Sequence, residues 1–180
     1  MLEDVLLIEQ KHKKAAKEIY YWIKSQSPKR SIIAISGESG SGKSELAHML
    51  ADYLKEDSLF TKILHMDDYY KIPPKNRKEW RQENGIDKIG LEEIDWNQLN
   101  RNIQDFKEKR IARLPCVDIL TDQIDTLMTD FKEIEMIIIE GLYAIHNSAD
   151  FKIFIDLTYR ETKKAQKQRR QEPQTKYRFD

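Results

Sequence analysis

The sequence predicts an α/β fold in which a parallel central sheet is flanked by helices. Short apolar runs of strand length alternate along the chain with segments of helical periodicity, and this alternation favours a buried parallel sheet with right-handed crossovers. The first run, residues 32–35, leads into a glycine-rich loop and then into a helix-like segment. The loop satisfies the phosphate-binding pattern G-x-x-x-x-G-K-[ST] in full, as Gly37-Glu38-Ser39-Gly40-Ser41-Gly42-Lys43-Ser44.

The N-terminal third begins with an expected helix over residues 2–24, because its apolar side chains form a rough stripe at helical spacing. A strand at residues 31–36 and a helix from 43 to about 57 enclose the loop. Glycines let successive backbone N–H groups turn inward and form an anion-binding nest, and the following helix adds its dipole and its first amides. Lys43 can then reach the outer phosphates of a nucleotide, and the Ser44 hydroxyl can ligate Mg²⁺.

The middle of the chain is expected to hold a strand, a polar segment and a helix. Residues 62–66 form a second short apolar run. Pro73-Pro74 interrupts the pattern, and residues 75–88 are very polar, which is typical of a substrate-covering lid or of a loop. Residues 92–109 carry apolar side chains at helical intervals and predict a helix.

The last third predicts a hairpin, two strands and a basic helix. Residues 113–118 and the alternating residues that follow suggest a hairpin or an extended flap. Residues 136–139 and 151–157 are continuous apolar runs that predict strands. The segment 159–171 is rich in lysine and arginine. This composition predicts either a solvated helix face or a lid that faces the phosphates.

Carboxylates stand where predicted strands end. A predicted strand ends at or just before each of three acidic residues, Asp67, Glu140 and Asp156. These side chains should therefore converge with the loop on one edge of the sheet. We expect Asp67 to accept the proton of an attacking hydroxyl and to reach Mg²⁺ through its water ligands. Glu140 is expected to hold Mg²⁺ through water. A cap, turn or other structural role remains the alternative for both side chains.

Two further residues beside Asp67 are candidates for substrate contact. Asp68 is expected either to hydrogen-bond a substrate hydroxyl or to serve as a turn carboxylate. Tyr70 is expected either to stack on a planar substrate or to pack in the core.

The overall composition bounds the function. The formal net charge is zero, from 31 basic and 31 acidic residues, so no general attraction to nucleic acid is expected. No apolar run approaches the roughly 20 residues that span a bilayer. A single cysteine, Cys116, fits a reducing compartment, and we expect a cytoplasmic protein.

Six short motifs occur in an order that resembles the uridine kinase and phosphoribulokinase family of P-loop kinases. They are the glycine loop, Asp67-Asp68-Tyr69-Tyr70, Ile94-Asp95-Trp96, Pro115-Cys116-Val117-Asp118, Ile138-Ile139-Glu140-Gly141 and Phe154-Ile155-Asp156. The resemblance implies a three-layer P-loop NTPase fold with a small hairpin, and ATP and Mg²⁺ as cosubstrate and metal. It also implies transfer of the γ-phosphoryl group to an alcohol, such as the 5′-hydroxyl of a nucleoside, and association into a homo-oligomer.

Site roles carry over by position. Lys43, Asp67 and Arg169 are the expected catalytic residues, with Arg169 in a lid near the transferred phosphate. Asp68 and Tyr70 are expected at the substrate, and Ser44, Asp67 and Glu140 at the metal. The ATP phosphates are expected to contact Gly37, Glu38, Ser39, Gly40, Ser41, Gly42, Lys43, Ser44 and Glu45.

We expect one domain over residues 1–180. Its parts are an N-terminal helix (1–27), the strand, loop and helix (31–57), a substrate-side insert (71–130) and a lid region (159–180). Relatives continue past the lid with another strand and helix, whereas this sequence stops at Asp180. Either the pocket for the nucleotide base is incomplete or the C-terminus is truncated.

The sequence also departs from uridine kinases. Val117 and Asp122 stand where those enzymes carry a tyrosine and a histidine that read the pyrimidine. A site without these hydrogen-bonding partners should discriminate less between bases. A kinase for another alcohol, such as pantothenate or a sugar phosphate, and a catalytically silent ATP-binding protein are therefore the alternatives. A GTP-driven switch is disfavoured, because no Asn-Lys-x-Asp or Thr-Lys-x-Asp segment occurs.

Overall fold

The structure is a computed structural model that describes residues 6–26, 29–118, 123–157 and 162–163. Among these residues, four parallel strands form the central sheet in the order β2-β5-β1-β6. Two further strands form a separate antiparallel hairpin. The strands are β1 (Ser31–Gly37), β2 (Thr61–His65), β3 (Ile111–Asp118), β4 (Gln123–Asp130), β5 (Met136–Glu140) and β6 (Phe151–Ile155). The predicted parallel sheet and hairpin are confirmed.

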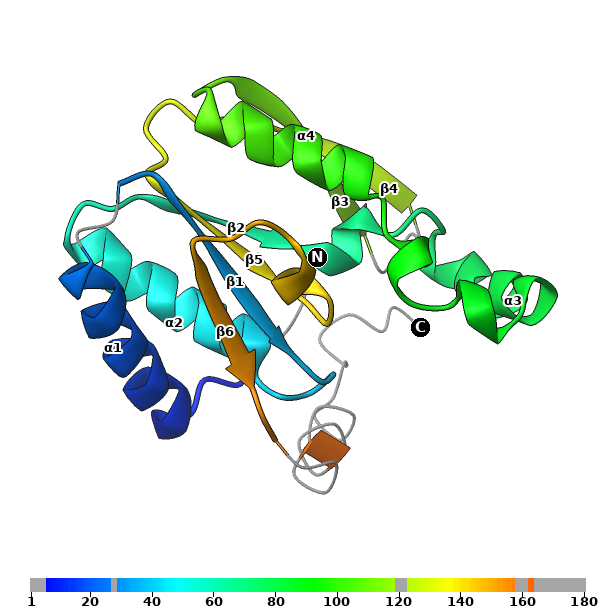
Figure 1. Cartoon of the computed structure of the whole chain (residues 1–180), viewed down its shortest axis with the longest axis horizontal. Coiled ribbons are helices and arrows are strands. Elements are labelled where there is room, and N and C mark those ends of the chain that lie inside the picture. The colour runs from blue at the N-terminus through cyan, green and yellow to red at the C-terminus, as the bar shows by residue number, and fades with distance from the viewer. Residues whose placement is uncertain (1–5, 27–28, 119–122, 158–161, 164–180) are drawn as a thin grey trace, which may run out of the picture.

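Helices and the hairpin cover the two faces of the sheet (Figure 1). On one face lie α1 (Gln10–Ser25) and α2 (Lys43–Glu56), and on the other lie α4 (Trp96–Lys107) and the β3–β4 hairpin. Strand β1 shows why both faces are covered: Ile32 and Ala34 belong to one buried core, whereas Ile33 and Ile35 belong to the other. Successive side chains of a strand point to opposite faces, so a continuous apolar run requires a layer on each side.

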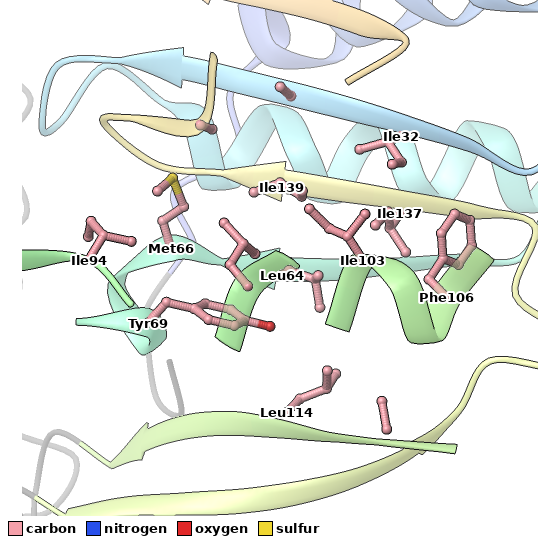
Figure 2. Packing of buried hydrophobic residues seen from close by; sticks show 14 of the residues in the cluster. Ile32, Leu64, Met66, Tyr69, Ile94, Ile103, Phe106, Leu114, Ile137 and Ile139 are labelled. Atoms are coloured by element: carbon pink, nitrogen blue, oxygen red, sulfur yellow. The ribbon is translucent and has the colours of Figure 1, made fainter. Parts of the chain in front are cut away.

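The core beneath α4 also fixes the turn that follows β2, residues Met66–Tyr69. Ile137 and Ile139 of β5, Phe106 of α4 and Leu114 of β3 all belong to this core. Phe106 lies at the Ile137 end of β5, and Leu114 lies on the hairpin side (Figure 2). Tyr69 is buried in the same core, and its hydroxyl donates a hydrogen bond to Asn102 Oδ1 at 3.1 Å. The residues immediately before Tyr69 are thereby anchored at the end of β2.

Two predicted helix starts are wrong. The helix expected from residue 2 begins at Gln10, because residues 6–9 are not helical and Leu7 N–H instead donates to Glu45 Oε1 at 3.3 Å. The helix expected from residue 92 begins at Trp96, because the Asp95 side chain accepts a hydrogen bond from Gln98 N and caps it. A short 3₁₀ turn, Leu91–Glu93, precedes that cap.

The polar segment 75–88, expected as a lid or a loop, lies mostly in a helix. This helix, α3 (Pro74–Asn84), starts with Pro74 at its first position, where a proline lacks no needed hydrogen bond. None of its residues is buried, and it projects beyond the sheet on the side away from α1 (Figure 1). Of the expected basic helix at 159–171, only Thr162 and Lys163 are described, and both are helical.

In the part of the chain that the structure describes, no helix combines the length and the apolar character needed to cross a bilayer.

Candidate functional site

The carboxyl ends of the strands bring the predicted site residues to one edge of the sheet. In the register of the parallel strands, Glu140 at the end of β5 pairs with Ile35 of β1 and with His65, the last residue of β2. The glycine-rich loop leaves β1 at Gly37, and Asp67 lies two residues beyond β2, in the 3₁₀ turn η1 (Met66–Tyr69). The loop, Asp67 and Glu140 therefore share one edge, as a parallel sheet predicts.

The loop has the local geometry of an anion cradle. Ser41 N–H donates to Glu38 O at 3.1 Å, and the first helical bond of α2 runs from Leu46 N to Gly42 O at 2.9 Å. Gly42 has φ +90°, a left-handed conformation that favours glycine. Ser41 Oγ is buried and has no hydrogen-bond partner among the described residues. A bound phosphate oxygen would satisfy this hydroxyl.

Lys43 lies folded over the loop. Its Nζ donates to Glu38 O at 2.8 Å, which keeps the ammonium group above the turn. The Glu38 side chain accepts a hydrogen bond from Thr162 Oγ1 at 3.3 Å. The start of the segment after β6 thus touches the loop directly.

Three polar side chains meet where Mg²⁺ is expected. Ser44 Oγ donates to Glu140 Oε1 at 3.2 Å, and His65 Nδ1 lies 2.6 Å from the same oxygen. Burial acts to raise the pKa of Glu140, but His65, Lys43 and Ser44 together hold that pKa below its usual value. An ionised carboxylate beside a hydroxyl is the donor set that Mg²⁺ uses, so the residues present fit the metal.

Asp67 has the environment expected of a proton acceptor. It is half-buried. Burial is the main cause that raises the pKa of Asp67, and the nearby Glu140 charge adds to it, while Arg77 and Lys43 oppose the shift. A carboxylate with a raised pKa is a stronger base than an ordinary aspartate.

Arg77 of α3 connects Asp67 to Tyr70. Its guanidinium lies 3.9 Å from the centre of the Tyr70 ring, and it donates to Asp67 O at 3.3 Å and to Ile72 O at 3.0 Å. Burial raises the pKa of Tyr70 to about 12, so this phenol is neutral at physiological pH. The aromatic ring predicted at the substrate is therefore covered on one face by a cation.

Asp68 anchors the hairpin. Its side chain is buried, and Oδ1 accepts a hydrogen bond from Val117 N on β3 at 2.9 Å. The Val117 side chain is fully buried as well. This geometry favours a structural role for Asp68, but through a long-range hydrogen bond to the hairpin that the predicted role of a turn carboxylate does not describe. Asp122 and Arg169 lie outside the described residues.

We expect Asp68→Ala to lower the free energy of unfolding by about 1–3 kcal/mol, because it leaves the buried Val117 N–H without this acceptor. Chemical denaturation measures the change, and Asp87→Ala, at an exposed aspartate, is the matched control. An unchanged stability together with a raised KM for the acceptor would instead make Asp68 a substrate contact.

A second arginine of α3 fixes the loop that follows it. Arg81 Nε and Nη2 donate to the two oxygens of Glu93 at 2.7 and 3.0 Å, and Gly90 N donates to Glu93 Oε2 at 2.9 Å. Burial acts to raise the pKa of Glu93, but these donors hold it below its usual value. An open groove of about 530 Å³ lies along this helix, lined by Pro74, Arg77, Lys78, Arg81, Gln82 and Ile89.

The sequence pattern missed three residues of this neighbourhood. His65 could have been found, because it is the last strand residue before Asp67 and parallel pairing places it beside Glu140. Arg77 and Arg81 carried no comparable signal, since they stand in a polar segment whose helix has no buried face.

Comparison with known proteins identifies a family of kinases. The family model described as Phosphoribulokinase / Uridine kinase family matches residues 32–175. Uridine kinases from Staphylococcus aureus (strain JH9) and Ureaplasma parvum serovar 3 (strain ATCC 27815 / 27 / NCTC 11736) are 30% and 28% identical over 130 residues, which is 69% of this chain. The match spans 61% of the length of these curated relatives.

Two of the solved structures that resemble this chain illustrate the shared fold. One is described as a candidate fructose transport system kinase from Silicibacter sp. TM1040, with a TM-score of 0.68 and 21% identity, covering 88% of this chain and 80% of the other. The second, described as a candidate uridine kinase from Bacillus stearothermophilus, has a TM-score of 0.62 and 21% identity, covering 89% and 92%. Similarity at this level of identity supports the three-layer P-loop kinase fold.

Proposed function

Because the chain belongs to the phosphoribulokinase and uridine kinase family, we propose that it transfers the γ-phosphoryl group of ATP to a hydroxyl of a small molecule. The observation that carries this proposal is the convergence of the loop, the Ser44–Glu140 pair and Asp67 on one edge of the sheet. Phosphoryl transfer requires positioning and charge neutralisation, and these groups supply both.

Each residue has a role in this proposal. The loop amides and Lys43 would bind and neutralise the outer phosphates. Ser44 and Glu140 would hold Mg²⁺, which would offset the charge of the phosphates. Asp67 orients the acceptor hydroxyl and takes its proton. Arg169 is proposed to add a positive charge near the transferred group.

We propose a nucleoside as the acceptor, through its 5′-hydroxyl. The names of the curated relatives support this choice, since both are uridine kinases. Tyr70, beside the Asp67 turn, offers an aromatic surface for a planar base. We further propose a cytoplasmic homo-oligomer that has no nucleic-acid or membrane partner.

An acceptor that carries a negative charge is the second candidate. The groove along α3 favours it, because three of the side chains that line it are basic and none is acidic. Sugar phosphates and pantothenate both combine a primary alcohol with an anionic group. Arg77 would then bind that group while remaining close to Asp67.

An ATP-consumption screen with Mg²⁺ tests these proposals. The acceptors are uridine, cytidine, adenosine, pantothenate and a set of sugar phosphates, and Lys43→Ala serves as the inactive control. Turnover with a nucleoside supports the first acceptor class, and turnover only with anionic alcohols supports the second. Nucleotide binding without turnover on any acceptor would contradict the kinase proposal and support a silent ATP-binding protein.

A further inference from the structure

The first turn of α1 lies against the glycine-rich loop. A Cβ atom placed on Gly42 would be only 2.8 Å from His12 Nε2 and 3.2 Å from His12 Cδ2. The imidazole thus fills the space that a side chain at position 42 would need. No feature of the sequence pattern pointed to this contact, because His12 lies 30 residues before Gly42 in a segment for which the pattern predicted only a helix.

The hydrogen bond at Nδ1 determines which nitrogen of the neutral His12 ring carries the proton. Glu9 N–H donates to His12 Nδ1 at 3.0 Å, so Nδ1 is an acceptor and the neutral ring carries its proton on Nε2. The edge that faces Gly42 is therefore an N–H donor. It lies at the N-terminus of α2, where the amides of an anion cradle are found.

The position of His12 is fixed from both sides. Ala16 and Ile23 of α1 are fully buried in the core that also contains Leu50 of α2. Before the helix begins, Leu7 N–H donates to Glu45 Oε1 in the first turn of α2. Helix α1 and the residues before it therefore hold the imidazole against the loop, and the ring itself is half-buried.

We propose that His12 is a nucleotide-binding residue whose Nε2–H donates a hydrogen bond to the phosphate chain of the bound nucleotide. This inference rests on the nucleotide site of the proposed function and extends it to the N-terminal helix. A phosphate oxygen is a charged acceptor, and hydrogen bonds to charged groups are stronger than neutral ones. Helix α1 is then part of the site as well as of the core.

Equilibrium binding of a fluorescent ATP analogue, without any acceptor, tests this proposal. His12→Ala is expected to raise the Kd about tenfold, as for the loss of one hydrogen bond to a charged group. His12→Gln, whose amide can place a donor near the position of Nε2, is expected to restore most of the affinity. Lys13→Ala, at the next and exposed residue, is the matched control and should leave the Kd unchanged.

Two further measurements separate binding from folding and from turnover. Thermal unfolding should give the same Tm for His12→Gln and His12→Ala, so that a difference in Kd reports the donor itself. With an accepted substrate, His12→Ala should raise the KM for ATP and leave kcat within about twofold, because a contact equal in ground and transition states changes binding alone.

The proposal is overturned if His12→Ala binds the analogue as tightly as the wild type, or more tightly. It is also overturned if glutamine weakens binding as much as alanine does, which would indicate a packing role. A wild-type protein that binds the nucleotide but phosphorylates no acceptor contradicts the kinase proposal and leaves this one standing. A wild-type protein that binds no nucleotide contradicts both.

Discussion

Lys43→Ala is expected to lower kcat by about 10² to 10³-fold, the usual cost of removing one preorganised charge-stabilising donor. Lys43 Nζ lies over the loop, where it donates a hydrogen bond to Glu38 O. From this position the ammonium group can reach the outer phosphates of a nucleotide held by the loop. Negative charge on these oxygens must be neutralised as the phosphoryl group moves, so the loss should appear mainly in kcat.

Steady-state kinetics with the best acceptor measures this effect, and Lys55→Ala at the other end of α2 is the matched control. The stability should change little, by less than about 1 kcal/mol, because the hydrogen bond to Glu38 O is exposed. A Lys43→Ala variant that folds normally and retains full turnover would exclude phosphoryl transfer at this loop.

The sheet could be predicted because its signal is local. Ile32-Ile33-Ala34-Ile35 is apolar at every position, and only a strand buried on both faces uses such a run. The Gly37–Ser44 loop specifies its own backbone conformation through its glycines, so its placement between strand and helix followed directly. Parallel strands then bring their carboxyl ends together, which correctly placed Glu140 and Asp67 beside the loop.

The helix starts could not be predicted from periodicity. Leu6 contributed to the apolar stripe assigned to the first helix, but it lies in a non-helical segment before that helix. In this segment the neighbouring Leu7 N–H donates a hydrogen bond to Glu45 Oε1 of α2. Helix α3 was missed for the opposite reason. It has no buried residue, so it shows no apolar stripe, and it is held through Arg77 and Arg81 instead.

The contacts that distinguish the roles of neighbouring acids depend on tertiary structure. Asp67 and Asp68 are adjacent and chemically identical, yet one is half-buried near Lys43 and Glu140, and the other is bonded to Val117. The hydrogen bond to Val117 joins residues far apart in the sequence, and it exists only because the hairpin packs over the η1 turn. The sequence motif alone left both acids as site candidates.

Asp67→Asn is expected to lower kcat by about 10² to 10⁴-fold, the range that general-base catalysis contributes. The amide is nearly the same size as the carboxylate but cannot accept the proton of the attacking hydroxyl. Nucleotide affinity in the absence of acceptor should change little, because the loop and Lys43 bind the phosphates. Asp87→Asn, at an exposed aspartate, is the matched control.

The same substitution should leave the protein without nucleotide and metal as stable as the wild type, or more stable, at neutral pH. Burial and the Glu140 charge raise the pKa of Asp67 above its ordinary value of 3.8, so the folded state binds this proton more tightly than the unfolded state. The stabilisation from protonated Asp67 is thus complete below pH 3.8 and is lost as the pH rises through the raised pKa. Asparagine has no charge to bury and avoids this loss.

Paired measurements of kcat and of unfolding free energy across pH therefore identify Asp67 as the base. The wild-type kcat should fall on the acid side at a pH above that of an ordinary aspartate, because only the ionised carboxylate accepts the proton. Asp67→Asn should lose this acid limb while gaining stability relative to the wild type as the pH rises. A variant with wild-type kcat would assign the proton transfer to another group, and a variant that is both inactive and much less stable would make Asp67 a structural carboxylate.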